Sequence, residues 1–371
     1  MVFHRISSPF IRNCLVPTFY YAAIIVAVAL AMFGLLFVKQ ELLNEHSPII
    51  TGISIPGQSV SSSPEPVRTS VSKAKPGEDE YYFIDEKLNA KVTVNKTAFK
   101  SRTCDRITGR RILMNYAERC CKSSQPKNCE TGLAHGFDIC LSFTQNSVDD
   151  WFVQHNSRVF AAITMAGYGI WKSFLSTILF APFIFKLNFF KFQKVMKILM
   201  TLEDNDVLFY SDSGAKWLDS AEDYFCLMDE RNQDVVVFSV GLPENEYTKG
   251  DAFLVADCTE RNCTHSQQRL GGYSMYRKSM RAFHFLSTWL TFNQDLRIVS
   301  DESSRLRKDM DHFKANRHDQ TALSLASKRC GLPEWPDPSQ FGQDGYNKML
   351  REKPEFKTIA KTIIDCTRDK S

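Results

Sequence analysis

Short apolar runs bounded by turn-forming residues recur along the C-terminal two thirds of the chain. Residues 207–210 (VLFY) form such a run, and the preceding Asn205 and Asp206 are turn formers. This pattern predicts a buried central strand of a sheet. The same pattern predicts strands over residues 111–116, 136–143 and 235–240, and an edge strand over residues 92–94.

Segments with helical spacing separate these strands. Residues 151–160 predict one helix, and within residues 281–296 the apolar Phe285, Trp289 and Phe292 are four and three positions apart. That spacing places the three side chains on one face of a helix. Strands that alternate with helices predict an α/β fold with a parallel, doubly wound sheet.

Glycine residues and helix-stop signals predict further elements toward the C-terminus. Residues 268–279 (QRLGGYSMYRKS) predict a glycine turn that leads into a strand and then a helix. A helix over residues 321–326 is predicted to end at Gly331. Residues 355–364 predict a terminal helix.

An uncharged segment near the N-terminus predicts a membrane anchor. Residues 15–38 carry no charged side chain and are long enough to cross a bilayer as a helix. A cleaved signal peptide, the alternative, has a shorter apolar region of about 7–15 residues. Arg5 and Arg12 precede the span and Lys39 follows it, which favours a cytoplasmic N-terminus. The pattern predicts a cytoplasmic tail (1–14) and an uncleaved type II signal anchor.

A stem and one large domain are predicted beyond the anchor. Residues 39–80 include a stretch rich in Pro, Ser and Val without periodicity, which favours a flexible stem. Residues 81–371 then form a lumenal domain, as is typical of processing enzymes of the Golgi or ER membrane. The 46 basic and 42 acidic residues nearly balance, so the charge favours no nucleic-acid partner.

The cysteines agree with a lumenal domain. Ten of the eleven cysteines lie beyond the anchor, and an even number in an oxidising compartment predicts disulfide bonds, although their pairing does not follow from the sequence. A zinc site is disfavoured because Cys120 and Cys121 are adjacent and no second CxxC pair is present. Acceptor tripeptides at Asn95 and Asn262 predict N-glycosylation.

Candidate chemistry begins where the 207–210 strand ends, at Ser211, Asp212, Ser213 and Gly214. Ligands of open α/β sheets bind beyond the carboxyl ends of the strands. A carboxylate at that place can hold a divalent cation, and the cation can hold a diphosphate. The alternative is an Asx-type turn in which the glycine lets the backbone turn sharply.

Two further stretches carry candidate side chains. Trp171 and Lys172 follow a pair of glycines in residues 167–173 (GYGIWKS), a pattern that favours stacking on a base or sugar and contact with phosphate; a core-capping aromatic loop is the alternative. Asp319 and its neighbours in residues 317–320 (RHDQ) precede a helix and either present polar groups to a ligand or cap the helix.

The ordered combination of YGIWKS (168–173), SDSG (211–214), GGYSMYRKS (271–279) and RHDQTALSLASK (317–328) resembles the nucleotide-sugar-dependent glycosyltransferases of the GT-A fold. It is more distantly similar to glycogenin-like and bacterial galactosyltransferases. The resemblance spans about residues 111–332 and implies a GT-A (Rossmann-like) mixed, mostly parallel sheet flanked by helices. It also implies a hexosyltransferase-like enzyme that uses a nucleotide-sugar donor and a glycan, protein or lipid acceptor.

The resemblance assigns residues to roles. It implies donor binding by Asp212, Ser213, Gly214, Gly272, Trp171, Lys172 and Arg317, and catalysis by Asp319, Gln320 and His318. Asp212 takes the aspartate-x-aspartate position, so it is the implied ligand of Mn²⁺ or Mg²⁺. This chain departs from the family pattern because Ser211 and Ser213 leave one carboxylate, and because no histidine follows His318. Lys172 or Arg317 is expected to neutralise the departing diphosphate.

Two other functions remain open at this stage. A catalytically inactive, membrane-anchored carbohydrate-binding protein on the same fold fits the single carboxylate. A Golgi sulfotransferase shares the anchor and stem, but the sequence after Tyr116 matches its phosphate-binding loop poorly. Nothing in the sequence singles out the pair of carboxylates that a glycosidase needs.

Residues 174–192 (FLSTILFAPFIFKLNFFKF) are predicted to be an insertion into a helix. The segment is too apolar for an exposed loop, and its lysines make it a poor membrane span. The hypothesis is that it is retained non-coding sequence. We expect the spliced transcript to lack it, and a sequenced message that contains it refutes the hypothesis.

Overall fold

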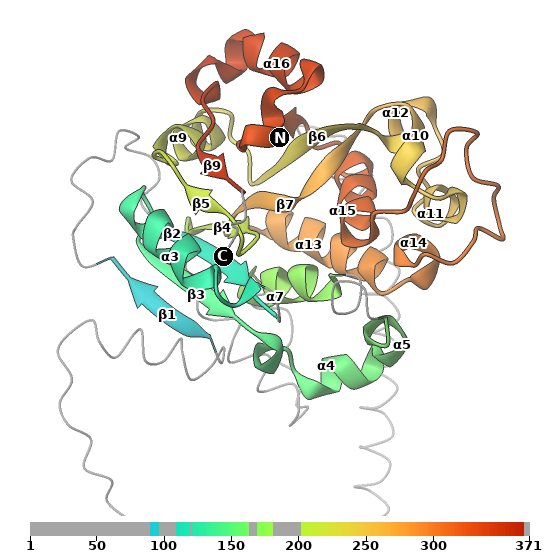
Figure 1. The fold of residues 1–371 in the computed structure, drawn as a ribbon, viewed down its shortest axis with the longest axis horizontal. Coiled ribbons are helices and arrows are strands. Elements are labelled where there is room, and N and C mark those ends of the chain that lie inside the picture. Colours follow the sequence, from blue (N-terminus) through green and yellow to red (C-terminus); the bar gives the residue numbers. More distant parts are fainter. Residues whose placement is uncertain (1–89, 96–108, 119–120, 163–168, 181–201, 367–371) are drawn as a thin grey trace, which may run out of the picture. The chain divides into compact units, whose positions relative to one another are not determined.

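A seven-stranded β-sheet organises the fold, with strand order β1-β3-β2-β4-β7-β6-β8 (Figure 1). The computed structural model describes residues 90–95, 109–118, 121–162, 169–180 and 202–366. The strands are β1 (Lys91–Val94), β2 (Arg111–Tyr116), β3 (Ile139–Phe143), β4 (Val207–Ser211), β6 (Val235–Pro243), β7 (Gln267–Arg277) and β8 (Glu334–Trp335). A separate pair joins β5 (Lys216–Trp217) to β9 (Ile364–Asp365).

The sheet is mixed and mostly parallel, as the sequence predicts. β3, β2 and β4 pair in parallel, and so do β6 and β8. β7 runs antiparallel to both β4 and β6, and β1 runs antiparallel to β3. Five strands therefore share one direction, and their carboxyl ends meet at one edge of the sheet.

Helices cover both faces of the sheet (Figure 1). One face packs against α3 (Gln125–Ala134), α9 (Glu222–Glu230), the 3₁₀ segment η4 (Pro354–Ile359) and the β5–β9 pair. The other face packs against α4 (Asp150–His155), α5 (Ser157–Phe160), α7 (Ile170–Phe180), α11 (Gly250–Val255), α13 (Met280–Asn293), α14 (Leu296–Val299) and α15 (His318–Arg329). The remaining segments are η2 (Gln145–Ser147), α10 (Glu244–Tyr247), α12 (Arg261–Thr264), η3 (Gln340–Gln343) and α16 (Gly345–Glu352).

β4 lies in the middle of the sheet with both faces covered, and this position explains why residues 207–210 are apolar. Leu208 and Tyr210 belong to the core on the α7 side, whereas Val207 and Phe209 belong to the core on the α3 side. Successive side chains of a strand point to opposite faces, so a strand covered on both faces needs apolar residues at every position.

Three expectations drawn from local pattern were wrong. The helix over residues 151–160 breaks at Asn156 into α4 and α5. Gly271 and Gly272 form no turn, because they lie inside β7. Residues 355–364 are not one helix: η4 ends at Ile359, and Ile364 pairs with Trp217. In the last case the pairing with a distant strand overrides the local preference.

The segments predicted at the N-terminal end of the chain stay predictions. The tail, the signal anchor (15–38) and the stem lie outside the described residues. Within the described ranges, no helix has the length and apolar character needed to cross a membrane. The insertion expected over residues 174–192 begins inside α7, where Phe174 and Leu175 are buried, and residues 181–192 are not described.

Cysteines within residues 81–371 form disulfide bonds, as their even number predicts, and two of these bonds lie within the described residues. Cys129 of α3 bonds to Cys140 of β3, and Cys258 bonds to Cys263 of α12. The first bond fastens a covering helix to the sheet. The second closes a short loop beside α11.

Phe209 offers a test of the central strand. Its side chain is fully buried in β4, so Phe209→Ala should lower the free energy of unfolding by about 3–5 kcal/mol through lost burial and a cavity. Urea denaturation of the folded chain measures the change. Phe341→Ala is the matched control, because Phe341 is 67% exposed and should change stability little. Equal effects for the two variants would contradict the central position of β4.

Candidate functional site

The candidate site forms where β4 ends, at Asp212. The Asp212 backbone N–H donates to the Gly272 carbonyl oxygen at 2.9 Å, which continues the pairing of β4 with β7 by one residue. The Ala215 N–H then donates to the Asp212 carbonyl oxygen at 3.0 Å and closes a turn. The Asp212 carboxylate is 52% exposed, so it faces solvent at the carboxyl edge of the sheet.

A buried asparagine holds this turn from behind. Asn128 of α3 donates from Nδ2 to the Ala215 carbonyl oxygen at 2.9 Å and to Ser211 Oγ at 3.2 Å. Ser213 is also buried. Gly214 differs from expectation: it lies outside the left-handed region, and a Cβ placed on it would meet nothing within 4 Å. The turn therefore depends on Asn128 more than on a glycine.

Lys172 of α7 lies between two carboxylates. Its Nζ is 2.9 Å from Asp319 Oδ2 and 3.4 Å from Asp212 Oδ1, and it donates to the Gly271 carbonyl oxygen at 3.2 Å. The Lys172 side chain is 3% exposed and that of Asp319 is 2% exposed. One ammonium group thus connects β4, β7, α7 and α15.

The pKa directions follow from this burial. Burial lowers the pKa of the Lys172 ammonium, but Asp212 and Asp319 outweigh burial and raise the pKa above its ordinary value. Burial raises the pKa of the Asp319 carboxyl, and the charge of Lys172 opposes that rise only in part. Lys172 therefore stays protonated across the physiological range, while Asp319 holds its proton more readily than an exposed aspartate.

Tyr210 also contacts the Asp212 carboxylate. Its hydroxyl group donates to Asp212 Oδ1, the same oxygen that contacts Lys172. Burial, followed by the charge of Asp212, raises the pKa of Tyr210 well above its ordinary value, so the phenol stays a donor. The other carboxylate oxygen, Oδ2, makes no hydrogen bond or ion pair in the described part of the chain. Side chains two positions apart in a strand share a face, so the sequence contained the signal for Tyr210.

Three glycines let the backbone approach these carboxylates. Gly169 has a φ of +75°, and a Cβ there would lie 2.7 Å from Asp319 Cγ. A Cβ on Gly271 would lie 3.3 Å from Asp319 Oδ2 and 3.0 Å from Gln320 Cβ, and one on Gly272 would lie 3.3 Å from Asp212 Oδ2. Gly272 thus faces the free oxygen of Asp212.

Residues 317–320 do not point in one direction. The Asp319 carboxylate contacts Lys172, but His318, at a φ of +52°, places Nδ1 2.9 Å from the Val299 carbonyl oxygen. Arg317 is exposed, and its guanidinium group lies over the Tyr247 ring, 5.5 Å from the centroid. The structure thus brings only part of this motif to Lys172.

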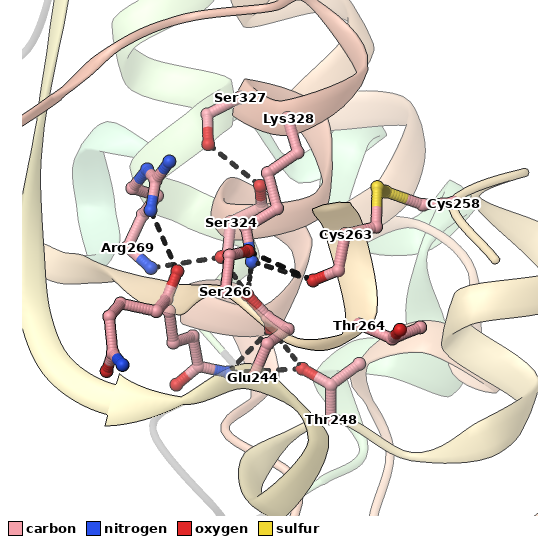
Figure 2. Close-up of polar contacts among 12 residues, drawn as sticks. Glu244, Thr248, Cys258, Cys263, Thr264, Ser266, Arg269, Ser324, Ser327 and Lys328 are labelled. Atoms are coloured by element: carbon pink, nitrogen blue, oxygen red, sulfur yellow. Dashed lines mark hydrogen bonds and ion pairs between the residues drawn. A yellow bond between two sulfur atoms is a disulfide. The ribbon is translucent and has the colours of Figure 1, made fainter. Parts of the chain in front are cut away.

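Gln320 faces the interior of the protein. Its Oε1 accepts from the Gly271 N–H at 3.1 Å, and its Nε2 donates to Gln268 Oε1 at 2.7 Å. Gln268 in turn donates to Glu244 Oε1 at 3.2 Å. Figure 2 shows the fully buried Glu244 receiving bonds from Thr248, Ser324 and Lys328. This network behind the site was missed by sequence reasoning, because its members are spread over β7, α10 and α15.

Trp171 is buried beside the site. It stacks on Tyr116 with 3.7 Å between ring centroids, and its ring lies 5.6 Å from Lys172 Nζ. Trp171 is 6% exposed. In this structure its ring therefore forms part of the wall behind Lys172.

The side chains at this site offer a divalent cation one protein ligand, a single carboxylate oxygen of Asp212. Within the described residues, no group of three or more His, Cys, Asp or Glu side chains is placed to hold a metal ion. Asp212 Oδ1 is engaged by Tyr210 and Lys172, whereas Oδ2 is free and lies on the exposed side. A divalent cation here would need phosphate oxygens and water to complete its shell.

Comparisons with known proteins leave the family open. No family model matches the chain, and no curated protein matches it. Among solved structures, the apo form of mouse xyloside xylosyltransferase 1 is similar to this chain with a TM-score of 0.34 and 10% identity. The match covers 70% of this chain and 97% of that one. A TM-score this low carries no argument about function.

Removing the ammonium group tests the buried cluster. Lys172→Met should lower the free energy of unfolding by about 3–5 kcal/mol at pH 7, because it leaves Asp319 buried without its partner. Asp319 would then bind a proton more tightly in the folded state than in the unfolded state, so the loss should shrink as the pH falls toward about 4. Urea denaturation over that pH range measures it.

Two further variants serve as controls. Lys172→Met combined with Asp319→Asn should recover much of the stability and lose the pH dependence of the single variant. Lys127→Met removes an exposed ion pair with Glu130 and should change stability by less than about 1 kcal/mol. A Lys172→Met variant as stable as the parent at neutral pH would contradict the charge arrangement described here.

Proposed function

We propose that the chain is a glycosyltransferase that transfers a sugar from a nucleotide-sugar donor to a glycan, protein or lipid acceptor. The observation that carries the proposal is the Asp212 carboxylate at the carboxyl end of the central strand, with one oxygen fixed by Tyr210 and Lys172 and the other free. Ligands of open α/β sheets bind at this edge. The four motifs that resemble GT-A transferases supply three of the residues around it: Lys172, Gly272 and Asp319.

The charges of the cluster indicate what the donor needs. Two carboxylates and one ammonium group leave a net negative charge when all three are ionised. A diphosphate would be repelled by that charge unless a cation came with it. We therefore include Mn²⁺ or Mg²⁺ in the proposal, with Asp212 Oδ2 as the protein ligand. When bound, the cation would supply positive charge to the departing nucleoside diphosphate.

The protein's own groups set the geometry. Lys172 and Tyr210 fix the rotation of the Asp212 carboxylate, and Asp319 fixes Lys172 in turn. The ammonium group therefore acts as a positioning group instead of reaching the diphosphate directly. The bare backbone at Gly272 leaves space beside Asp212 Oδ2 for the donor. Preorganisation of this kind lowers a barrier through orientation and electrostatics.

The cellular setting is part of the proposal. We combine the predicted type II anchor over residues 15–38 with the two disulfide bonds and place the domain in the lumen of the Golgi or ER. The donor would then be a nucleotide-sugar of that compartment. The acceptor would be carried by the secretory pathway.

Donor binding can be tested without knowing the acceptor. We expect at least one UDP- or GDP-sugar to raise the melting temperature of the full chain in detergent, and to do so more strongly with Mn²⁺ than with a chelator. Asp212→Asn should remove the Mn²⁺-dependent part of the shift and lower donor hydrolysis by about 10²–10³-fold. Asp311→Asn is the matched control, because its carboxylate is 89% exposed and lies outside the cluster.

The outcomes separate the alternatives. A donor that stabilises the chain without turnover would favour the inactive carbohydrate-binding protein. The absence of a shift with every donor, or hydrolysis that is unchanged in Asp212→Asn, would refute the proposed enzyme.

A further inference from the structure

A cavity lies away from Asp212. It has a volume of about 740 Å³ and is bounded by α4, α5, the end of α13, α14 and residues 300–306. Cavities of roughly 300–1,000 Å³ are typical of sites for small ligands. No residue of the Lys172 cluster lines it, so the site proposed above does not account for it.

Buried polar side chains form the floor of the cavity. Asn156, Lys249, Asp251 and Ser300 line it and are buried. The Asp251 carboxylate accepts from the backbone N–H groups of residues 305, 306 and 307 at 2.9, 2.7 and 2.9 Å. These bonds hold the loop that forms one wall. The Asp251 carboxylate is therefore satisfied by hydrogen bonds within the protein.

The remaining charges favour an anion. Four basic and three acidic side chains line the cavity. Asp295 and Arg297 pair with each other, and Lys249 donates to oxygens of Ser300 and Glu302 within the described part of the chain. The guanidinium groups of Arg158 and Arg305 are exposed at the rim and have no ion pair or hydrogen bond among the described residues. Among the described residues, Glu302 is the one lining carboxylate without a hydrogen bond or ion pair to its side chain, so these two guanidinium groups outnumber it.

An aromatic surface adjoins the same rim. His155 lines the cavity, and its ring lies 4.1 Å from the ring of Trp151, which is 45% exposed. The apolar C–H face of a sugar ring can pack on such an exposed aromatic group. Guanidinium groups bind carboxylates and sulfates through paired hydrogen bonds. A saccharide that carries an acidic group matches both features, whereas an apolar ligand matches neither.

One segment connects this cavity with the cluster around Lys172. Ser300 and Glu302 line the cavity, and Asp301 between them has Oδ1 3.8 Å from His318 Nε2. His318 also contacts the Val299 carbonyl oxygen and directly precedes Asp319. An occupant of the cavity would therefore lie against the segment that packs on the start of α15.

We propose that this cavity binds an acidic saccharide and that this saccharide belongs to the acceptor. The second half of the statement rests on the proposed transferase function. The first half stands on the cavity alone. Arg158 and Arg305 bind the acidic group, and the polar floor binds hydroxyl groups.

Binding of defined sugars to the full chain tests this inference. Isothermal titration should show a glucuronic-acid-containing disaccharide binding at least about tenfold more tightly than the glucose-containing counterpart, whose carboxylate is replaced by a hydroxymethyl group. A sulfated disaccharide of the same size shows whether the site prefers carboxylate or sulfate. Arg158→Ala with Arg305→Ala should abolish the preference for the acidic sugar. Arg261→Ala, an exposed arginine on α12, should not.

The readouts distinguish this inference from the proposed function. The double variant should retain the parent's melting temperature and its stabilisation by the nucleotide-sugar donor. Equal binding of the acidic and neutral sugars, or a double variant that binds like the parent, would overturn the inference while leaving donor binding untouched. Loss of donor stabilisation in the double variant would also overturn it, because the arginines would then serve the nucleotide. Loss of donor binding in the parent would instead count against the transferase.

Discussion

The buried ammonium group of Lys172 is the interaction on which the candidate site depends. Removing an ammonium and a carboxylate from water is unfavourable for each alone, and only their mutual contact makes the burial tolerable. Lys172, Asp319 and Asp212 come from three different elements, α7, α15 and the end of β4. The cluster can therefore exist only when those elements are docked on the sheet. It ties the assembly of the fold to the orientation of one exposed carboxylate.

The surrounding backbone makes this cluster sterically feasible. Gly271 leaves out a side chain where Gln320 approaches, so α15 lies directly against β7, and Gly169 does the same where Asp319 approaches the start of α7. The Gln320 side-chain amide accepts a hydrogen bond from the Gly271 N–H and donates one to Gln268. The position of the helix is thus fixed by polar contacts as well as by apolar packing. A network of this kind selects one packing arrangement among many apolar ones.

The sequence allowed the sheet and the position of Asp212 to be predicted, but not the directions of the side chains around it. The strand at residues 207–210 was recognisable because both of its faces are covered and every position is apolar. Residues 317–320 looked like one functional set, yet Asp319 turns to Lys172 and His318 to the Val299 carbonyl oxygen. Local pattern cannot reveal such choices, since each is decided by a partner that is distant in sequence. The glycine pair in β7 shows the same limit, because glycines predict a turn where close packing requires a strand.

The disulfide bond between Cys258 and Cys263 affects the buried polar network around Glu244 as well as the short loop that it closes. The Cys263 carbonyl oxygen accepts a hydrogen bond from Lys328 Nζ at 3.1 Å, and Lys328 also pairs with the buried Glu244 (Figure 2). Reduction of the bond would release the covalent restraint on that carbonyl group and weaken a contact that a desolvated cation needs. Chain folded under reducing conditions would therefore have a looser polar interior than chain in which the bond has formed. Formation of this disulfide bond would then be a condition for the mature polar interior around Glu244.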